Sequence, residues 1–352
     1  MKVGMIGFAR SGKTTVFNAI TGASAEVGTY GNREANLAVI KVPDDRVDKL
    51  SEIFKPKKKT YAEFEFIDIA PAENADNNNA LDNAALNLLK NADALVHVVR
   101  AFKDENVMHP LDSVDPARDV QALEEELQIT DFIIIEKRIQ RLEKERRKDQ
   151  EYDLLIRCKE HLETGNPLRN LSMNPQEETL LRSFTFLSQK PMMLLGNYGE
   201  DAIGNEDPAR LSKTAEEQNL KQIEFCGTLE MDVSQLPREE QADFREELGL
   251  GEESRIRFIQ FAYEMLGLMS FLTAGEPEVR AWTIRKETRA VDAAGVIHSD
   301  ISRGFIRAET VAYNDFMDAG SMVKSKENGK VRLEGKEYIV KDGDMLLFRF
   351  NV

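Results

Sequence analysis

The sequence is poor in the features that mark secreted and membrane proteins. Only two of its 352 residues are cysteines, Cys158 and Cys226, so a disulfide framework cannot form and we expect a reducing, cytoplasmic setting. Apolar runs are all shorter than the roughly 18 residues that a membrane helix needs. The apolar run at the N-terminus is also too short for a signal peptide. The sequence therefore predicts no membrane partner.

Positive charge is also scarce, with 47 basic against 62 acidic residues and a net charge of −15. This balance argues against a dedicated DNA-binding protein. The charge is uneven, however, because residues 200–253 hold 16 acids and 5 bases. Residues 137–148 instead hold 7 bases and 2 acids. A local basic surface can therefore exist on this acidic chain.

Short apolar strands separated by helical segments predict a parallel sheet with helices on its faces. The expected strands are 3–6, 36–42, 61–69, 94–99 and 191–196. Between the last two, residues 119–163 contain no glycine or proline and carry leucine and isoleucine at helical spacing. This pattern predicts an inserted helical hairpin that turns near residues 148–150.

The last 85 residues or so have a different pattern, in which several strands follow one another closely. We expect strands at 279–285, 304–311, 338–340 and 345–350. They predict a separate α+β module.

A phosphate-binding loop follows the first strand. Gly7, Gly12, Lys13 and Thr14 match the Walker A pattern, in which backbone N–H groups cradle a phosphate. The lysine reaches the β- and γ-phosphates, and the Thr14 hydroxyl binds Mg²⁺. A chance match is the alternative, but the preceding strand and following helix favour a nucleotide site.

Two further segments can complete this site. Asp68 ends a strand and can hold Mg²⁺ through water. Taken alone, an acid at a strand end indicates only a solvated turn, but the phosphate loop favours the metal role. Asn197 and Glu200 follow another strand, where guanine-reading proteins have Asn-Lys-x-Asp. Tyr198 replaces the lysine, and the longer Glu200 side chain could leave room for the amino group of adenine. A polar loop without a ligand is the alternative reading.

These motifs resemble the Obg-like ATPase family, also called the YchF family, of P-loop GTPases. The resemblance covers nearly the whole chain and is most specific near the C-terminus. The matching segments are VPDDRVDKL at 42–50, FIDIA at 66–70, FLTAGEPEVRAWTIR at 271–285, AGVIHSD at 294–300 and DGDMLLFRFNV at 342–352.

The resemblance implies an α/β P-loop NTPase G domain at 1–118 and 187–267. It also implies an inserted, coiled-coil-like helical hairpin at 119–186 and a β-grasp TGS domain at 268–352. The implied activity is hydrolysis of ATP, preferred over GTP, with Mg²⁺, in association with the ribosome or ribosomal RNA. The implied nucleotide-binding residues are Arg10, Ser11, Gly12, Lys13, Thr14, Thr15, Asn197, Glu200, Cys226, Gly227 and Thr228, with Thr14 and Asp68 at the metal.

For catalysis, the resemblance implies Lys13 and a loop histidine in place of the glutamine that positions water in Ras-like proteins. His109 occupies the matching place. An exposed loop histidine without a catalytic role is an equal alternative.

The chain departs from the family pattern at both positions that sense the γ-phosphate. Pro71 stands where a glycine N–H is expected, and proline has no N–H to donate. Asn32 stands where the family has a Mg²⁺-binding threonine, and Arg10 and Ser11 replace the usual Asn-Val or Gly-Val. We therefore expect nucleotide binding with slow hydrolysis. The alternative is a non-hydrolysing nucleotide-binding scaffold that acts through its hairpin and TGS module. A small-molecule kinase is disfavoured, because the sequence offers no candidate for the lid or for the substrate acid or base that such an enzyme needs.

The basic tip of the hairpin carries Lys144, Arg146, Arg147 and Lys148. A solvated helix face is the usual meaning of such a run. Next to a neutral C-terminal module, it also predicts a surface for ribosomal RNA.

Overall fold

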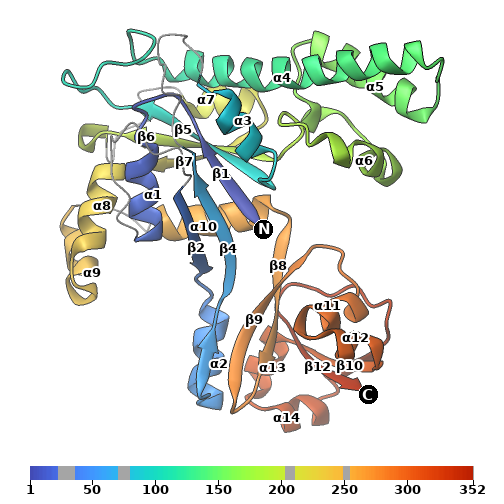
Figure 1. Ribbon diagram of the computed structural model, residues 1–352. Coiled ribbons are helices and arrows are strands. Elements are labelled where there is room, and N and C mark those ends of the chain that lie inside the picture. Colours follow the sequence, from blue (N-terminus) through green and yellow to red (C-terminus); the bar gives the residue numbers. More distant parts are fainter. Residues whose placement is uncertain (23–35, 70–79, 203–210, 249–253, 352) are drawn as a thin grey trace. The chain divides into compact units, whose positions relative to one another are not determined.

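The computed structural model describes residues 1–22, 36–69, 80–202, 211–248 and 254–351 (Figure 1). The chain forms two compact units. The first contains Met1–Val39 and Glu65–Phe258, and the second contains Ile40–Phe64 and Ile259–Val352. Each unit contains most of one six-stranded sheet. Strands β2 and β4 of the first sheet contribute residues to both units.

The first sheet has the strand order β2-β4-β1-β5-β6-β7. Its strands are β1 (Lys2–Ile6), β2 (Asn36–Val42), β4 (Ala62–Asp68), β5 (Ala94–Ala101), β6 (Met192–Tyr198) and β7 (Lys221–Phe225). From β4 to β7 every neighbouring pair is parallel. The carboxyl ends of these five strands therefore meet at one edge, where ligands bind in open α/β sheets. The sequence predicted all of these strands except β7.

Helices cover both faces of this sheet because successive side chains of each strand point to opposite sides. Helices α1 (Lys13–Thr21), α8 (Gly227–Gln235) and α10 (Ser254–Met265) belong to one face. There the Phe66 ring stacks on Phe17 and meets Phe258 edge-to-face. Helices α3 (Asn83–Leu89), α4 (Pro116–Lys144) and α7 (Leu211–Glu217) pack through a second core that includes Leu95 and Leu123. Helix α9 (Arg238–Glu247) follows α8.

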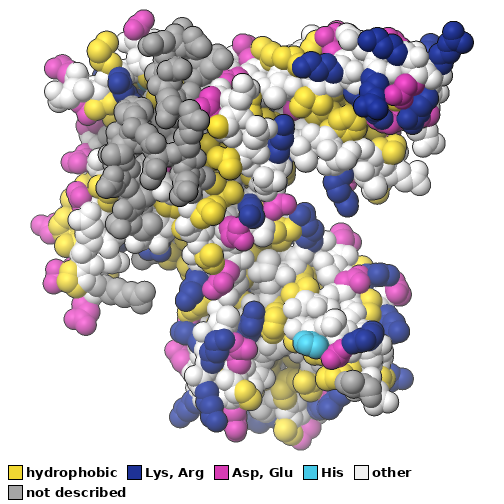
Figure 2. Space-filling view, viewed as in Figure 1, with side chains coloured by type: hydrophobic (Ala, Val, Ile, Leu, Met, Phe, Trp, Pro, Cys, Tyr) yellow, Lys and Arg dark blue, Asp and Glu magenta, His cyan; other side chains and the backbone are white. Residues whose placement is uncertain are grey.

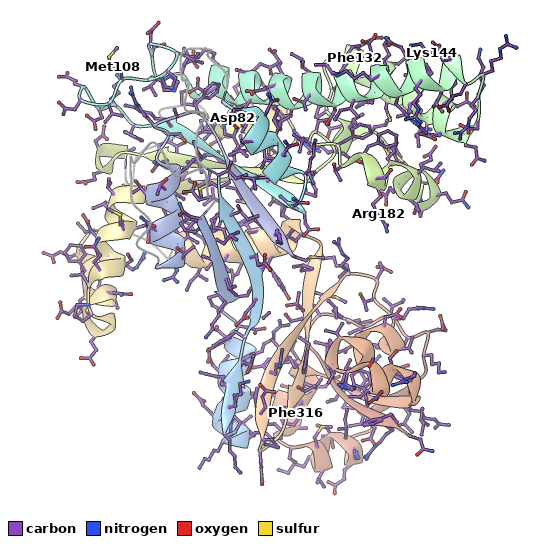
Figure 3. All side chains as sticks on the ribbon, viewed as in Figure 1. Asp82, Met108, Phe132, Lys144, Arg182 and Phe316 are labelled. Atoms are coloured by element: carbon purple, nitrogen blue, oxygen red, sulfur yellow. The ribbon has the colours of Figure 1, made fainter. Side chains whose placement is uncertain are left out.

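Helices α4 and α5 (Gln150–Glu163) form the predicted hairpin, and its far end carries Lys144 (Figures 1 and 3). Its core contains Ile135, Leu142, Leu155 and Cys158, so this cysteine is a packed thiol. Helix α6 (Pro175–Leu181) follows, flanked by the short 3-10 turns Leu168–Asn170 and Arg182–Phe184. Among the described helices, none is long and apolar enough to span a membrane.

The base of the hairpin is tied to the chain that leads into β6. Asp131, buried in α4, accepts hydrogen bonds from the N–H groups of Leu187 and Ser188 at 2.9 and 2.7 Å. The Ser188 hydroxyl donates a third bond at 2.6 Å. Burial raises the pKa of Asp131 to about 6, against the opposing effect of these donors. The inserted helices are therefore joined to the first sheet by a specific buried polar contact.

The second unit contains a mixed sheet with the order β11-β10-β12-β8-β9-β3. Its strands are β3 (Lys58–Thr60), β8 (Leu268–Ala274), β9 (Glu278–Arg285), β10 (Phe305–Ala312), β11 (Arg332–Glu334) and β12 (Asp344–Phe350). Its helices are α2 (Asp45–Phe54), α11 (Ala290–Ile297), α12 (Ser299–Arg303), α13 (Tyr313–Ala319) and α14 (Met322–Glu327). Phe271, Phe305 and Phe348 lie in the core between the sheet and α11.

This unit differs from the sequence-based expectations in several strands, since the short strands β3 and β11 were not predicted. The predicted strand at 338–340 was wrong, because Ile339 makes only a single bridge, to Arg289. Strand β8 was not predicted, since a short run of buried apolar residues does not distinguish a strand from a helix.

The segment Ile40–Phe64 precedes most of the first unit in sequence but belongs to the second unit. Strand β3 pairs with β9, and Arg46 at the start of α2 donates a 2.7 Å hydrogen bond to Asp342. These contacts explain why this segment, which the resemblance places in the G domain, belongs to the second unit. The domain boundaries drawn from the resemblance stay a prediction.

Candidate nucleotide-binding site

The phosphate loop joins β1 to α1 at the carboxyl edge of the first sheet. Gly7 and Gly12 have φ values of 144° and 88°, a conformation that residues with a side chain rarely adopt. A Cβ at Gly7 would lie 2.4 Å from the carbonyl oxygen of Val98, and one at Gly12 would lie 2.2 Å from Nδ2 of Asn197. Only glycine fits at either position, so the loop brings its backbone close to strands β5 and β6.

Lys13 folds back over this loop. Its Nζ donates hydrogen bonds to the carbonyl oxygens of Gly7 at 2.7 Å and Phe8 at 2.8 Å. Burial lowers the pKa of Lys13 to about 8, and the nearby charge of Asp68 offsets only part of this effect. The amine is therefore mostly charged at pH 7 and is held where a phosphate cradled by the loop would meet it.

The two predicted metal residues are in contact. The Thr14 hydroxyl donates to Oδ2 of Asp68 at 3.0 Å, and Nδ2 of Asn36 donates to the same oxygen at 3.2 Å. The other carboxylate oxygen, Oδ1, is buried and accepts no hydrogen bond from any described residue. A hydroxyl and a carboxylate oxygen are the hard ligands that Mg²⁺ prefers.

Protein side chains alone do not complete a metal site here. Within the described ranges, no group of three or more His, Cys, Asp or Glu residues could hold a metal ion. Mg²⁺ usually keeps several waters and binds through one or two protein groups together with substrate phosphates. Thr14 and Asp68 therefore fit Mg²⁺ that arrives with a nucleotide, and the unpartnered Oδ1 offers an acceptor for a metal-bound water.

Asn197 connects the phosphate loop to the loop that precedes α8. Its Nδ2 donates to the carbonyl oxygen of Ser11 at 3.0 Å, and its Oδ1 accepts from the N–H of Gly227 at 3.0 Å. Thr15 also lies beside Gly227, where a Cβ would be 3.4 Å from the threonine methyl group. Cys226 is buried and lies before the first turn of α8. The structure thus brings three predicted segments together.

The remaining residues of the predicted base loop differ in exposure. Tyr198 ends β6 and is buried, and its hydroxyl accepts a hydrogen bond from Gln222 at 3.2 Å. Glu200 is exposed and begins the 3-10 turn Glu200–Ala202. Thr228 lies next to Cys226, with 3.4 Å between its Oγ1 and the cysteine sulfur. Glu200 is therefore open to solvent, as is the acidic residue that follows it, Asp201.

His109 lies near the phosphate loop but is not an exposed loop residue. Only 5% of it is exposed, and its ring centroid is 6.2 Å from that of Phe8. Nδ1 accepts from the N–H of Leu111, and Nε2 lies 2.9 Å from Oδ2 of Asp119. Burial lowers the pKa of His109. The ring is therefore neutral, with its proton on Nε2, facing Asp119.

Arg10 fastens the same segment to the phosphate loop. Its Nη1 donates to the carbonyl oxygen of Met108 at 3.1 Å, in the loop between β5 and α4 (Figure 3). Its φ of 63° is uncommon for a residue with a side chain. The arginine that departs from the family pattern thus contacts the residue before His109.

Other site features were missed by the sequence reasoning or lie beyond the described residues. Asn36 and Asp119 contact site residues, but each is a polar residue within a predicted strand or helix and gave no motif signal. Asn32 and Pro71, on which slow hydrolysis was predicted, lie outside the described residues.

The hydrogen bonds that Asn197 makes to two loops predict a loss of stability when its side chain is changed. Asn197→Asp keeps an acceptor for the N–H of Gly227 but places a carboxylate oxygen against the carbonyl oxygen of Ser11. We expect the free energy of unfolding to fall by about 1–3 kcal/mol in urea titrations. Asn87→Asp on α3 is the control, because its oxygen still accepts from Lys90 in solvent. Equal stability of the two variants would contradict the bridging role.

The chain matches two family models: "50S ribosome-binding GTPase" at residues 2–138, and a model for the C-terminal domain of YchF GTPases, described as a protein of unknown function, at residues 268–351. It is 42% identical over 364 residues to the "Ribosome-binding ATPase YchF" of Bacillus subtilis (strain 168), covering 100% of both chains. The Escherichia coli O157:H7 protein of the same name is 37% identical over 360 residues, covering 100% of this chain and 99% of the other.

A solved YchF GTPase from Schizosaccharomyces pombe superimposes with a TM-score of 0.85 at 29% identity, covering 99% of this chain and 97% of the other. The predicted P-loop fold, with helices on both faces of a sheet and an additional C-terminal module, is confirmed. With full-length identity to curated relatives of up to 42% among those compared, the chain belongs to the YchF family.

Proposed function

We propose that this chain is a Mg²⁺-dependent, purine-nucleotide-binding P-loop NTPase that prefers ATP, hydrolyses it slowly and acts with the ribosome in the cytoplasm. The observation that carries the proposal is the phosphate loop: a strained, glycine-dependent backbone with buried Lys13 above it and Thr14 bonded to Asp68. The relatives named "Ribosome-binding ATPase YchF" support both the reaction and the partner.

The site residues receive the following roles. Backbone N–H groups of the phosphate loop and the first turn of α1 bind the phosphates, and Lys13 neutralises the charge that develops on them. Thr14 and Asp68 would hold Mg²⁺, which would supply positive charge to offset the charge of the phosphates. Asn197 and Gly227 shape the loops beside the base.

The slow rate is proposed on two grounds. Pro71 and Asn32 lack the N–H group and the hydroxyl expected for sensing the γ-phosphate. In addition, both nitrogens of His109 face other groups, so the ring must leave Asp119 before it can assist an attacking water. The second candidate function, a nucleotide-binding scaffold without hydrolysis, has the same support and differs only in turnover.

The end of the helical hairpin is proposed as the contact with ribosomal RNA. Figure 2 shows Lys and Arg side chains gathered over this end of α4 and α5. Arg147 is paired with Asp149 at 2.6 Å, but Lys144 and Arg146 form no ion pair with any described residue. Lys148 lies over the ring of Tyr152 at 5.7 Å. Unpaired charges of this kind release counterions when they meet phosphates, which favours binding at low salt.

Calorimetric titration with ATP and GTP, with and without Mg²⁺, tests the activity together with a turnover assay. We expect tighter binding of ATP, dependence on Mg²⁺, and slow turnover that Lys13→Ala abolishes. The Bacillus subtilis relative is the reference for rate. Tight GTP with weak ATP binding would contradict the assignment of Glu200. Equal rates would contradict slow hydrolysis, and binding without any turnover would favour the scaffold.

The lowered pKa of Lys13 predicts how nucleotide affinity depends on pH. Bound phosphates stabilise the charged amine, so above pH 8 binding must take up a proton. We expect affinity to be level near pH 7 and to weaken by up to about tenfold between pH 8 and pH 9. Calorimetry in two buffers of different ionisation enthalpy measures the proton uptake. Constant affinity without proton uptake at pH 9 would contradict a buried amine with this pKa.

The hairpin assignment predicts a charge effect on ribosome co-sedimentation. The variant Lys144→Gln, Arg146→Gln, Lys148→Gln should bind more weakly at low salt, with a salt dependence reduced by about two to three counterions. The matched control, Lys144→Arg, Arg146→Lys, Lys148→Arg, keeps the charge at the same positions and should bind like the parent. If both variants bind alike, the hairpin tip is not the contact.

A further inference from the structure

Among the described residues, only one oxygen of the Asp68 carboxylate has hydrogen-bond donors. The residue is 2% exposed, and both of its described donors, the Thr14 hydroxyl and the Asn36 amide, reach the same oxygen, Oδ2. Oδ1 is buried and accepts no hydrogen bond from any described residue. Two donors from different elements, α1 and β2, hold Oδ2 and so leave Oδ1 as the oxygen without a described partner.

We propose that Asn36 is a positioning residue for the metal site, which orients Asp68 so that Oδ1 can accept from a Mg²⁺-bound water. This inference rests on the proposed function, because it requires that the site binds Mg²⁺ with a nucleotide. Thr14 is itself a candidate metal ligand, so Asn36 is the described donor to Asp68 that acts on the carboxylate alone. Groups that orient a metal ligand in this way tune metal affinity without touching the ion.

The chemistry of an amide suits this role. It donates a hydrogen bond without carrying charge, so it orients the carboxylate and leaves its negative charge available to the cation. Lys13 already interacts electrostatically with Asp68. A second cation at position 36 would neutralise the carboxylate further and oppose Mg²⁺ binding. A hydrophobic residue there would leave the buried carboxylate with one donor fewer.

The location of Asn36 argues against a packing role. It is the first residue of β2, which is an edge strand and lies next to β4 in the sheet. The residue is exposed, yet its amide reaches the buried carboxylate at the end of β4. Truncation of this side chain therefore removes little buried apolar area, and the variant is expected to fold.

The test measures Mg²⁺ affinity separately from nucleotide affinity. Full-length protein is freed of metal with EDTA and saturated with a fluorescent ATP analogue, and MgCl₂ is then titrated in. For Asn36→Ala we expect the half-saturating Mg²⁺ concentration to rise about tenfold, with unchanged affinity for the analogue in EDTA. Val39→Ala is the matched control, because Val39 lies on the same strand and is 62% exposed.

A double variant separates positioning from a general structural effect. In the Asp68→Ala background, the further change Asn36→Ala should leave the half-saturating Mg²⁺ concentration unchanged, because the carboxylate that it orients is gone. An equal rise in both backgrounds would overturn the inference. So would an equal loss of analogue affinity with Mg²⁺ and with EDTA, since a positioning residue for the metal acts only when the metal is bound.

The role of Asn36 and the proposed Mg²⁺-dependent function are tested by different results. If the parent protein binds the analogue with clear Mg²⁺ dependence and Asn36→Ala behaves like Val39→Ala, only the role of Asn36 is wrong. If the parent binds the analogue without any effect of Mg²⁺, the proposed metal-dependent function fails, and the inference fails with it.

Discussion

The candidate site depends on a buried amide that joins two loops far apart in the chain. Asn197 donates to Ser11, 186 residues earlier, and accepts from Gly227 in the loop before α8. Both of its polar ends are used in a buried setting, where an unmade hydrogen bond costs about 1–3 kcal/mol. The close approach of Asn197 also explains why residue 12 must be glycine. The phosphate loop and the base loops therefore keep one relative geometry.

Within this fixed geometry, the described hydrogen-bond partners satisfy the charged groups of the site only in part. Lys13 is held by two loop carbonyls and loses basicity through burial, while Asp68 keeps one buried oxygen without a partner among the described residues. In the function proposed for this chain, a nucleotide bound with Mg²⁺ supplies the missing groups, since phosphate favours the charged amine and a metal-bound water favours the free oxygen. His109 differs, because burial favours its neutral form against the opposing charge of Asp119.

Much of the fold and of the phosphate loop could be predicted from the sequence, because both follow from local residue patterns. The glycine spacing of the phosphate loop, the apolar strands and the helical spacing of Ile135, Ile139 and Leu142 each depend on residues close in the chain. Other features depend on distant partners. Strand β8 was not predicted, because its short apolar run lacks the periodicity that distinguishes a strand from a helix. Ile40–Phe64 joins the second unit through β3 and Arg46, a choice made by contacts with β9 and Asp342.

The sequence by itself determined the phosphate loop, the P-loop fold class and the family, since each rests on residue types at short, fixed spacing. Only the tertiary structure decided that Asn36 contacts Asp68, that His109 is buried against Asp119, and that Asn197 bridges two loops. The physical reason is that a hydrogen bond between side chains depends on distance and direction in space. The order of the strands and helices in space brings these residues together, and no local pattern records that order.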